Sequence, residues 1–155
     1  MKSVIIMDIL LDTSVLLDFM LPYRQKHERA KILINFLSEN NHTLYTPSHA
    51  WFEAVSAINC EARINPKDLA SVKIYRGNKK INIIQISIDK KFTDNHLSLP
   101  LPNLKSADMI YAVIAIKDKM ILLTEDKKLL KEVNKLGGKA LNIESAISEF
   151  INSVS

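Results

Sequence analysis

Four acidic residues stand at positions in the sequence where their side chains can act together. Asp12 and Asp126 each follow a short apolar run with the character of a strand, in LLDTSVLLDF and ILLTEDKKLL. Asp108 lies in the first turn expected for the apolar helix SADMIYAVIAI, and Glu53 is the single charge in the apolar run AWFEAVSAI. An acid on an apolar face is costly to bury unless it is paired or binds a metal ion. These four residues are therefore candidates for one shared site.

Carboxylates brought within a few ångströms of one another repel and raise one another's pKa values. A hard divalent cation relieves this repulsion, and oxygen ligands suit Mg²⁺ or Mn²⁺. Such an ion, or a pair of ions about 4 Å apart, activates water and stabilises the displacement at a phosphodiester. The chain thus has the groups needed for metal-assisted hydrolysis of phosphodiester bonds.

Each of these residues also has a simpler structural interpretation. Asp12 and Asp126 can cap the helices that follow them, and Asp108 can favour a helix dipole. Glu53 can face solvent, because the helix phase is uncertain by a residue or two. Two neighbouring hydroxyl residues, Ser14 and Thr124, can be ordinary turn residues. Other acids compete for a place in the site: Asp8, Asp18, Asp89, Asp94 and Glu125.

The elements that must position these acids alternate along the chain. The expected strands cover residues 9–11, 43–46, 81–88, 120–124 and 139–143. The expected helices cover residues 15–21, 25–39, about 48–63, 65–76, 106–117, 127–136 and 144–154, while 89–104 reads as irregular. Alternation of this kind predicts an α/β fold with a parallel sheet covered on both faces, and sites in such sheets form at the carboxyl ends of the strands.

Length and composition are those of one folded domain over residues 1–155, with 1–6 expected to be an N-terminal extension. Among the 155 residues, 47% are apolar and 25% are charged, and the net charge of +4 is compatible with nucleic acid. The single cysteine, Cys60, excludes an intramolecular disulfide, predicts a cytoplasmic protein and is expected in the core. No apolar run approaches the roughly 18 residues that a membrane span needs.

Taken in order, the strings LLDTSVLLDF, SADMIYAVIAI and LLTEDKKLLKEV, with a mid-chain glutamate in an apolar helix, resemble the PIN domain. Within that family the chain is most similar to VapC-type toxins of prokaryotic toxin–antitoxin pairs. The resemblance runs from about Met7 to Phe150. It implies a three-layer α/β/α sandwich with a five-stranded parallel sheet in the order 3-2-1-4-5.

The resemblance also implies roles for individual residues. Asp12 and Asp108 are the expected direct metal ligands. Asp126 completes the site or binds a second ion, and Glu53 binds through water or orients the attacking water. The hydroxyls expected to hold carboxylates or waters are those of Ser14 and Thr124. Lys105, close in sequence to Asp108, is expected to contact RNA phosphates.

The resemblance implies a metal-dependent ribonuclease that is the toxin of a toxin–antitoxin pair. It also implies Mg²⁺ or Mn²⁺ as the cofactor, RNA as the substrate, a cognate antitoxin as a partner, and a homodimer. A housekeeping RNA-processing PIN nuclease and a scaffold that binds RNA or protein without cutting are the alternatives. A receiver-like phospho-acceptor domain shares the α/β plan. It requires an acidic pair at the first strand, however, and Asp8 and Asp12 are not adjacent.

Overall fold

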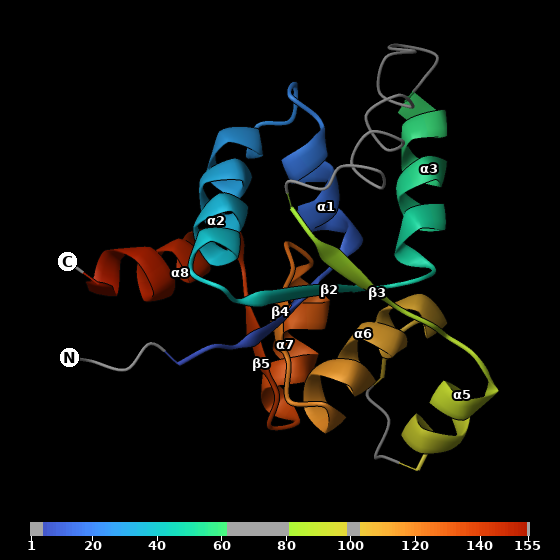
Figure 1. Cartoon of the computed structure of the whole chain (residues 1–155). Coiled ribbons are helices and arrows are strands. Elements are labelled where there is room, and N and C mark those ends of the chain that lie inside the picture. Colours follow the sequence, from blue (N-terminus) through green and yellow to red (C-terminus); the bar gives the residue numbers. More distant parts are fainter. Residues whose placement is uncertain (1–4, 62–80, 99–102, 155) are drawn as a thin grey trace.

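A computed structural model describes residues 5–61, 81–98 and 103–154 of the chain. Its centre is one sheet of five parallel strands in the order β3-β2-β1-β4-β5 (Figure 1). The strands are β1 (Asp8–Leu11), β2 (Thr43–Pro47), β3 (Ile83–Ile86), β4 (Ile121–Leu123) and β5 (Lys139–Leu141). The strand order expected from the sequence is confirmed.

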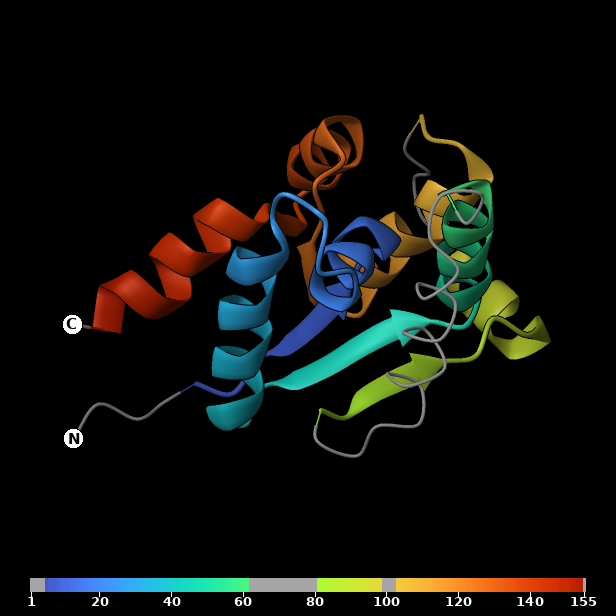
Figure 2. The same cartoon turned by 90° about the horizontal axis from the view of Figure 1, so that it is seen from above.

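Helices connect successive strands and cover both faces of the sheet. They are α1 (Thr13–Met20), α2 (His27–Glu39), α3 (Ala50–Glu61), α5 (Lys90–His96), α6 (Ser106–Lys117), α7 (Lys127–Lys135) and α8 (Ile143–Ala146). Figures 1 and 2 show α1, α2 and α3 on one side of the sheet and α6 and α7 on the other. The result is the expected three-layer α/β/α arrangement.

The middle strand explains why the chain folds this way. Ile9, Leu10 and Leu11 of β1 are fully buried, because helices cover the strand on both faces. A strand covered on both faces is apolar at every position, and this continuous apolar run is the pattern visible in the sequence. The pairing of Leu11 with Leu123 aligns the carboxyl ends of β1 and β4. The residues that follow these two strands are thereby placed beside each other.

The structure differs from the sequence prediction in the segment expected to be irregular. Residues 90–96 form α5, which begins after Asp89, whose carboxylate accepts a hydrogen bond from the Phe92 backbone N–H at 2.9 Å. His96 is the last residue of the helix. Its Nδ1 atom lies 2.7 Å from the Phe92 carbonyl oxygen, and its Nε2 atom lies 3.0 Å from the Asp118 carboxylate. The two prolines that suggested irregularity, at 100 and 102, follow this helix in the sequence and so do not interrupt it.

Smaller differences concern single residues and the ends of elements. Cys60 is exposed rather than in the core. The final helix expected over 144–154 is instead α8 followed by a π-helical turn, Ile147–Ile151, and a 3₁₀ turn, Asn152–Val154. The helix expected over residues 65–76 lies outside the described residues. Within the part that the structure describes, no helix combines the length and apolar character needed to cross a membrane.

Candidate active site

Asp12 is a buried residue that follows the carboxyl end of the central strand, and it is 6% exposed. Two hydroxyls donate to its Oδ2 atom, Ser14 at 2.9 Å and Thr124 at 2.6 Å. Although Asp12 precedes α1, its side chain makes no capping hydrogen bond, so the simpler interpretation as a helix cap does not hold. Burial raises the pKa of Asp12, and the two hydroxyl hydrogen bonds partly oppose this rise.

Asp126 is linked to Asp12 by hydrogen bonds through Thr124. The Thr124 hydroxyl accepts a hydrogen bond from the Asp126 backbone N–H at 3.0 Å while it donates to Asp12. The Asp126 Oδ1 atom accepts from the backbone N–H groups of Lys128 and Leu129, at 2.9 and 3.0 Å. Asp126 therefore does cap α7, as the simpler interpretation proposed, but it uses a single carboxylate oxygen for this purpose.

Glu53 projects from the first turn of α3 and is only partly exposed. Its Oε1 atom lies 2.9 Å from His49 Nε2 and accepts a hydrogen bond from the Tyr111 hydroxyl at 3.3 Å. The Tyr111 hydroxyl is also 2.8 Å from Thr13 Oγ1. The sequence pattern did not single out His49, Thr13 or Tyr111. Thr13 follows Asp12 directly, and Tyr111 is a polar residue on a mostly apolar helix, three residues after Asp108.

Asp108 occupies the first turn of α6 and shares an electrostatic environment with the other acids. Its pKa is raised by partial burial first and then by the negative charges of Asp126 and Glu53. The positive charges of Lys105 and Lys128 oppose this rise. Glu53 also contributes to the raised pKa of Asp12. The four acids named from the sequence therefore interact electrostatically, and two lysines add positive charge beside them.

The competing acids are mostly engaged in structural contacts elsewhere. Asp18 forms an ion pair with Arg24 at 2.7 Å, and Asp94 pairs with Lys90 at 2.6 Å. Glu125 pairs with Lys26 and accepts a hydrogen bond from the Ile143 backbone N–H. These contacts give Asp18, Asp94 and Glu125 partners other than the four acids named from the sequence.

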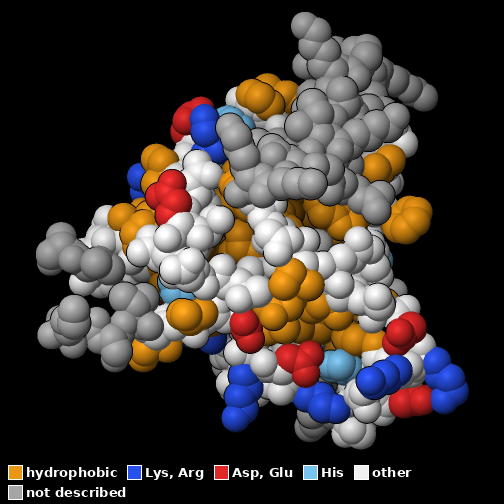
Figure 3. All heavy atoms as spheres, in the orientation of Figure 1, with side chains coloured by type: hydrophobic (Ala, Val, Ile, Leu, Met, Phe, Trp, Pro, Cys, Tyr) orange, Lys and Arg blue, Asp and Glu red, His pale blue; other side chains and the backbone are white. Residues whose placement is uncertain are grey.

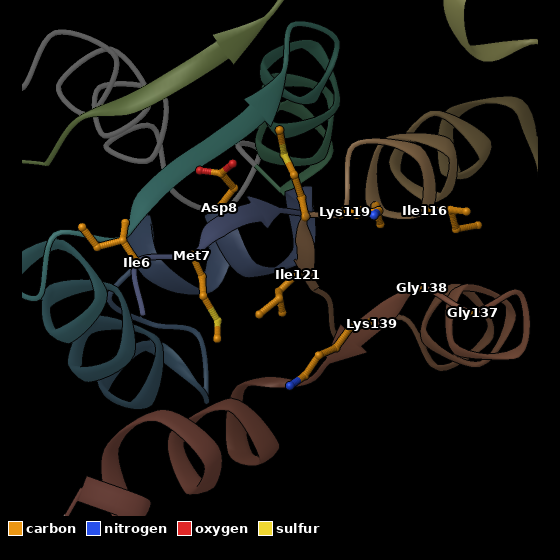
Figure 4. Close-up of a pocket in the computed structure, with 11 residues that line it drawn as sticks. Ile6, Met7, Asp8, Ile116, Lys119, Ile121, Gly137, Gly138 and Lys139 are labelled. Carbon is orange, nitrogen blue, oxygen red and sulfur yellow. The ribbon is translucent and has the colours of Figure 1, made fainter. Parts of the chain in front are cut away.

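Asp8 starts β1 and lies at the opposite edge of the sheet from Asp12. It lines a hollow of about 440 Å³ (Figure 4), which is otherwise lined mainly by apolar residues and two lysines, Lys119 and Lys139. A single carboxylate that shares a hollow with two lysines is not the kind of acidic group that attracts a divalent cation. Of the two ends of β1, the end that carries Asp12 is therefore the candidate for the chemistry expected from the sequence.

The comparison with known families agrees with this fold. Residues 9–136 match the PIN domain family. The chain belongs to the PIN domain family. No curated protein matches it.

Solved structures share the fold of this PIN domain at low sequence identity. PAE2754 from Pyrobaculum aerophilum is 17% identical with a TM-score of 0.62, over 96% of this chain and 99% of that one. VapBC2 from Rickettsia felis, bound to a DNA fragment from its promoter, is 15% identical with a TM-score of 0.62, over 88% and 98%. VapC20 from Mycobacterium tuberculosis, a sarcin–ricin loop cleaving toxin, is 14% identical with a TM-score of 0.54, over 84% and 96%.

The acids of this PIN domain fit a hard cation by their chemistry, although their side chains do not converge as a ligand set. In residues 5–61, 81–98 and 103–154, no three His, Cys, Asp or Glu side chains form a group able to hold a metal ion. Asp12, Glu53 and Asp126 nevertheless share one arrangement. In each, the contacts above fall on a single carboxylate oxygen, and no described side chain hydrogen-bonds the other oxygen. The contacts described above thus hold one oxygen of each carboxylate, and the other oxygen receives no hydrogen bond from a described side chain.

Proposed function

We propose that this PIN domain is a ribonuclease that hydrolyses RNA phosphodiester bonds with Mg²⁺ or Mn²⁺. The observation that carries the proposal is Asp12, a buried carboxylate that forms no ion pair with any described residue. A buried charge without a partner of opposite sign is costly, and a bound cation removes this cost. The bound ion would supply an activated water and stabilise the negative charge that develops at phosphorus.

The roles of the chain's own residues follow from their contacts. Asp12, Asp108 and Asp126 would hold the ion, and Glu53 would bind it through water or orient the attacking water. Ser14 and Thr124 fix the Asp12 carboxylate, since both hydroxyls donate to its Oδ2 atom. The positive charges of two lysines near Asp108, Lys105 and Lys128, suit contacts with RNA phosphates; such contacts raise affinity without reading the base sequence.

The first test removes the metal. With Mg²⁺ or Mn²⁺, the purified protein should cleave single-stranded or looped RNA, and excess chelator should stop cleavage completely. Added Mn²⁺ in excess over the chelator should restore the rate, because the ion generates the nucleophile. Gel analysis of end-labelled RNA over time measures both steps. Cleavage that persists in chelator would contradict the proposed mechanism, and RNA binding without cleavage across a broad RNA panel would favour the scaffold alternative.

We further propose that the protein is the toxin of a toxin–antitoxin pair and that it forms a homodimer. The similarity in fold to VapBC2 and VapC20 supports the first proposal, and a housekeeping RNA-processing role is the competing one. Exposed apolar area supports the second. On α2, Leu33 is fully buried, but its neighbour Ile32 is 49% exposed. An apolar groove of about 350 Å³ also lies between α5 and α6, where Figure 3 shows hydrophobic side chains gathered at the surface.

Measurements of molecular mass test both the homodimer and the complex with an antitoxin. Alone, the protein should have the mass of a dimer at micromolar concentration. Co-expressed with the product of the gene just upstream, it should form a larger complex that no longer cleaves RNA. Light scattering after size-exclusion chromatography gives both masses. A monomeric mass contradicts the dimer, and an upstream neighbour that is not a small DNA-binding protein favours the housekeeping role.

A further inference from the structure

A line of buried polar side chains connects Glu53 to the residue that follows Asp12. It begins at Thr13, the first residue of α1, whose Oγ1 atom lies 2.8 Å from the Tyr111 hydroxyl. It continues from Tyr111 on α6 to Glu53 on α3, at 3.3 Å. Tyr111 is fully buried and Thr13 is 7% exposed. Three helices on different parts of the chain therefore meet through two hydroxyl groups beside the candidate site.

The direction of these hydrogen bonds follows from the chemistry of the three groups. A carboxylate can only accept, so Tyr111 must donate its single hydroxyl proton to Glu53. The Tyr111 oxygen is then free to accept, and the donor in the other bond must be Thr13. Burial raises the pKa of Tyr111 far above its usual range, with the negative charge of Asp12 as the next cause. The phenol therefore keeps its proton at neutral pH.

His49 does not replace Tyr111 in holding Glu53. Its Nε2 atom lies within ion-pair distance of Glu53 Oε1, at 2.9 Å, but neither ring nitrogen forms a hydrogen bond with the described residues. The His49 ring packs against the Tyr111 ring instead, with centroids 5.2 Å apart. Among described side chains, the Tyr111 hydroxyl is thus the one directional hydrogen-bond donor to Glu53.

We propose that Tyr111 is a positioning residue for metal binding: supported by Thr13, it anchors Glu53 Oε1 and so presents Oε2 to the ion or to its bound water. This inference rests on the proposed metal site at Asp12, Asp108 and Asp126. It concerns residues that do not touch RNA, since Tyr111 has no exposed surface. Loss of the Tyr111 hydroxyl should therefore weaken the binding of the ion and leave the binding of RNA unchanged.

The experiment measures Mn²⁺ binding by titration calorimetry, without RNA. Tyr111→Phe keeps the ring and removes the hydroxyl, and should weaken Mn²⁺ binding about tenfold, the lower end of the usual effect of a lost hydrogen-bond partner behind a ligand. Thr13→Val should weaken it in the same direction, and Thr13→Ser, which keeps the hydroxyl, should restore wild-type affinity. In the nuclease assay, Tyr111→Phe should lower kcat at subsaturating Mn²⁺ without changing the KM for RNA.

The outcomes separate this inference from the proposed function. If the wild type binds Mn²⁺ but cleaves no RNA, the ribonuclease proposal fails while the role of Tyr111 is still measured. Wild-type Mn²⁺ affinity in folded Tyr111→Phe would overturn the inference, as would a wild type that binds no Mn²⁺. Equal losses in Thr13→Val and Thr13→Ser would also overturn it, because the loss would then not depend on the hydroxyl. Circular dichroism establishes that each variant is folded.

Discussion

Asp12→Asn should abolish metal-dependent RNA cleavage and leave the fold intact. Asparagine has nearly the same size, and its carbonyl oxygen can still accept from Ser14 and Thr124, so the packing of β1 is unchanged. The substitution removes the negative charge that the ion requires. Activity should fall by more than the roughly 100-fold that the loss of a partner behind a metal ligand costs. Initial rates of RNA cleavage in saturating Mn²⁺ provide the measurement.

The same substitution should stabilise the metal-free protein in a pH-dependent way. Because burial raises the pKa of Asp12, the folded protein binds more protons than the unfolded chain between the usual and the raised pKa. The free energy of unfolding of the wild type therefore falls as pH rises through this interval. The Asp12→Asn variant has no such titration, so its advantage should be largest at neutral pH and should vanish in acid. Thermal unfolding at several pH values, in chelator, measures this difference.

The matched control lies on the same strand. Asp8→Asn makes the identical chemical change at the opposite edge of the sheet, where the side chain is exposed. It should leave RNA cleavage and Mn²⁺ binding at wild-type levels. Equal loss of activity in both variants would point to a general effect of charge and contradict a site at Asp12. Full activity in Asp12→Asn would remove this residue from the mechanism.

The parts of the fold that the sequence predicted well are those with one strong physical signal. Residues 9–11 of β1 and all of β4 are continuous apolar runs because both faces are covered, and a polar residue follows each strand. Parallel pairing then aligns their carboxyl ends, which is why the residues after Leu11 and Leu123 could be expected side by side. Local pattern and general sheet geometry together suffice for this part of the structure.

The parts that the sequence did not predict depend on contacts between distant residues. Helix α5 is stabilised by the cap at Asp89 and by the contact of His96 with Asp118, and the second of these joins residues 22 positions apart. The neighbours of Glu53 include Tyr111 on another helix, 58 positions away. No periodic pattern encodes such a meeting. For Asp126, the structural interpretation holds because the side chain caps α7, and the role as a metal ligand remains a prediction.

Thr124→Val should weaken both the stability of the fold and the binding of the metal ion. Thr124 is fully buried, and its hydroxyl bridges Asp12 and the backbone of Asp126. Valine fills the same volume but leaves the Asp126 N–H and one side of the Asp12 carboxylate without their partner. An unsatisfied buried polar group costs about 1–3 kcal/mol, and the free energy of unfolding should fall by an amount in this range. Urea unfolding at neutral pH measures the change.

The effect on the ion follows from the same hydrogen bond. Donation by Thr124 lowers the pKa of Asp12, so its loss raises that pKa further and makes the carboxylate a poorer ligand at neutral pH. Mn²⁺ affinity should fall roughly 10- to 100-fold. Thr124→Ser keeps the hydroxyl and should recover most of the Mn²⁺ affinity, while losing some stability with the missing methyl group. If Thr124→Val bound Mn²⁺ as tightly as the wild type, the Thr124 hydroxyl would serve the fold alone, and the orientation of Asp12 would have to depend on Ser14.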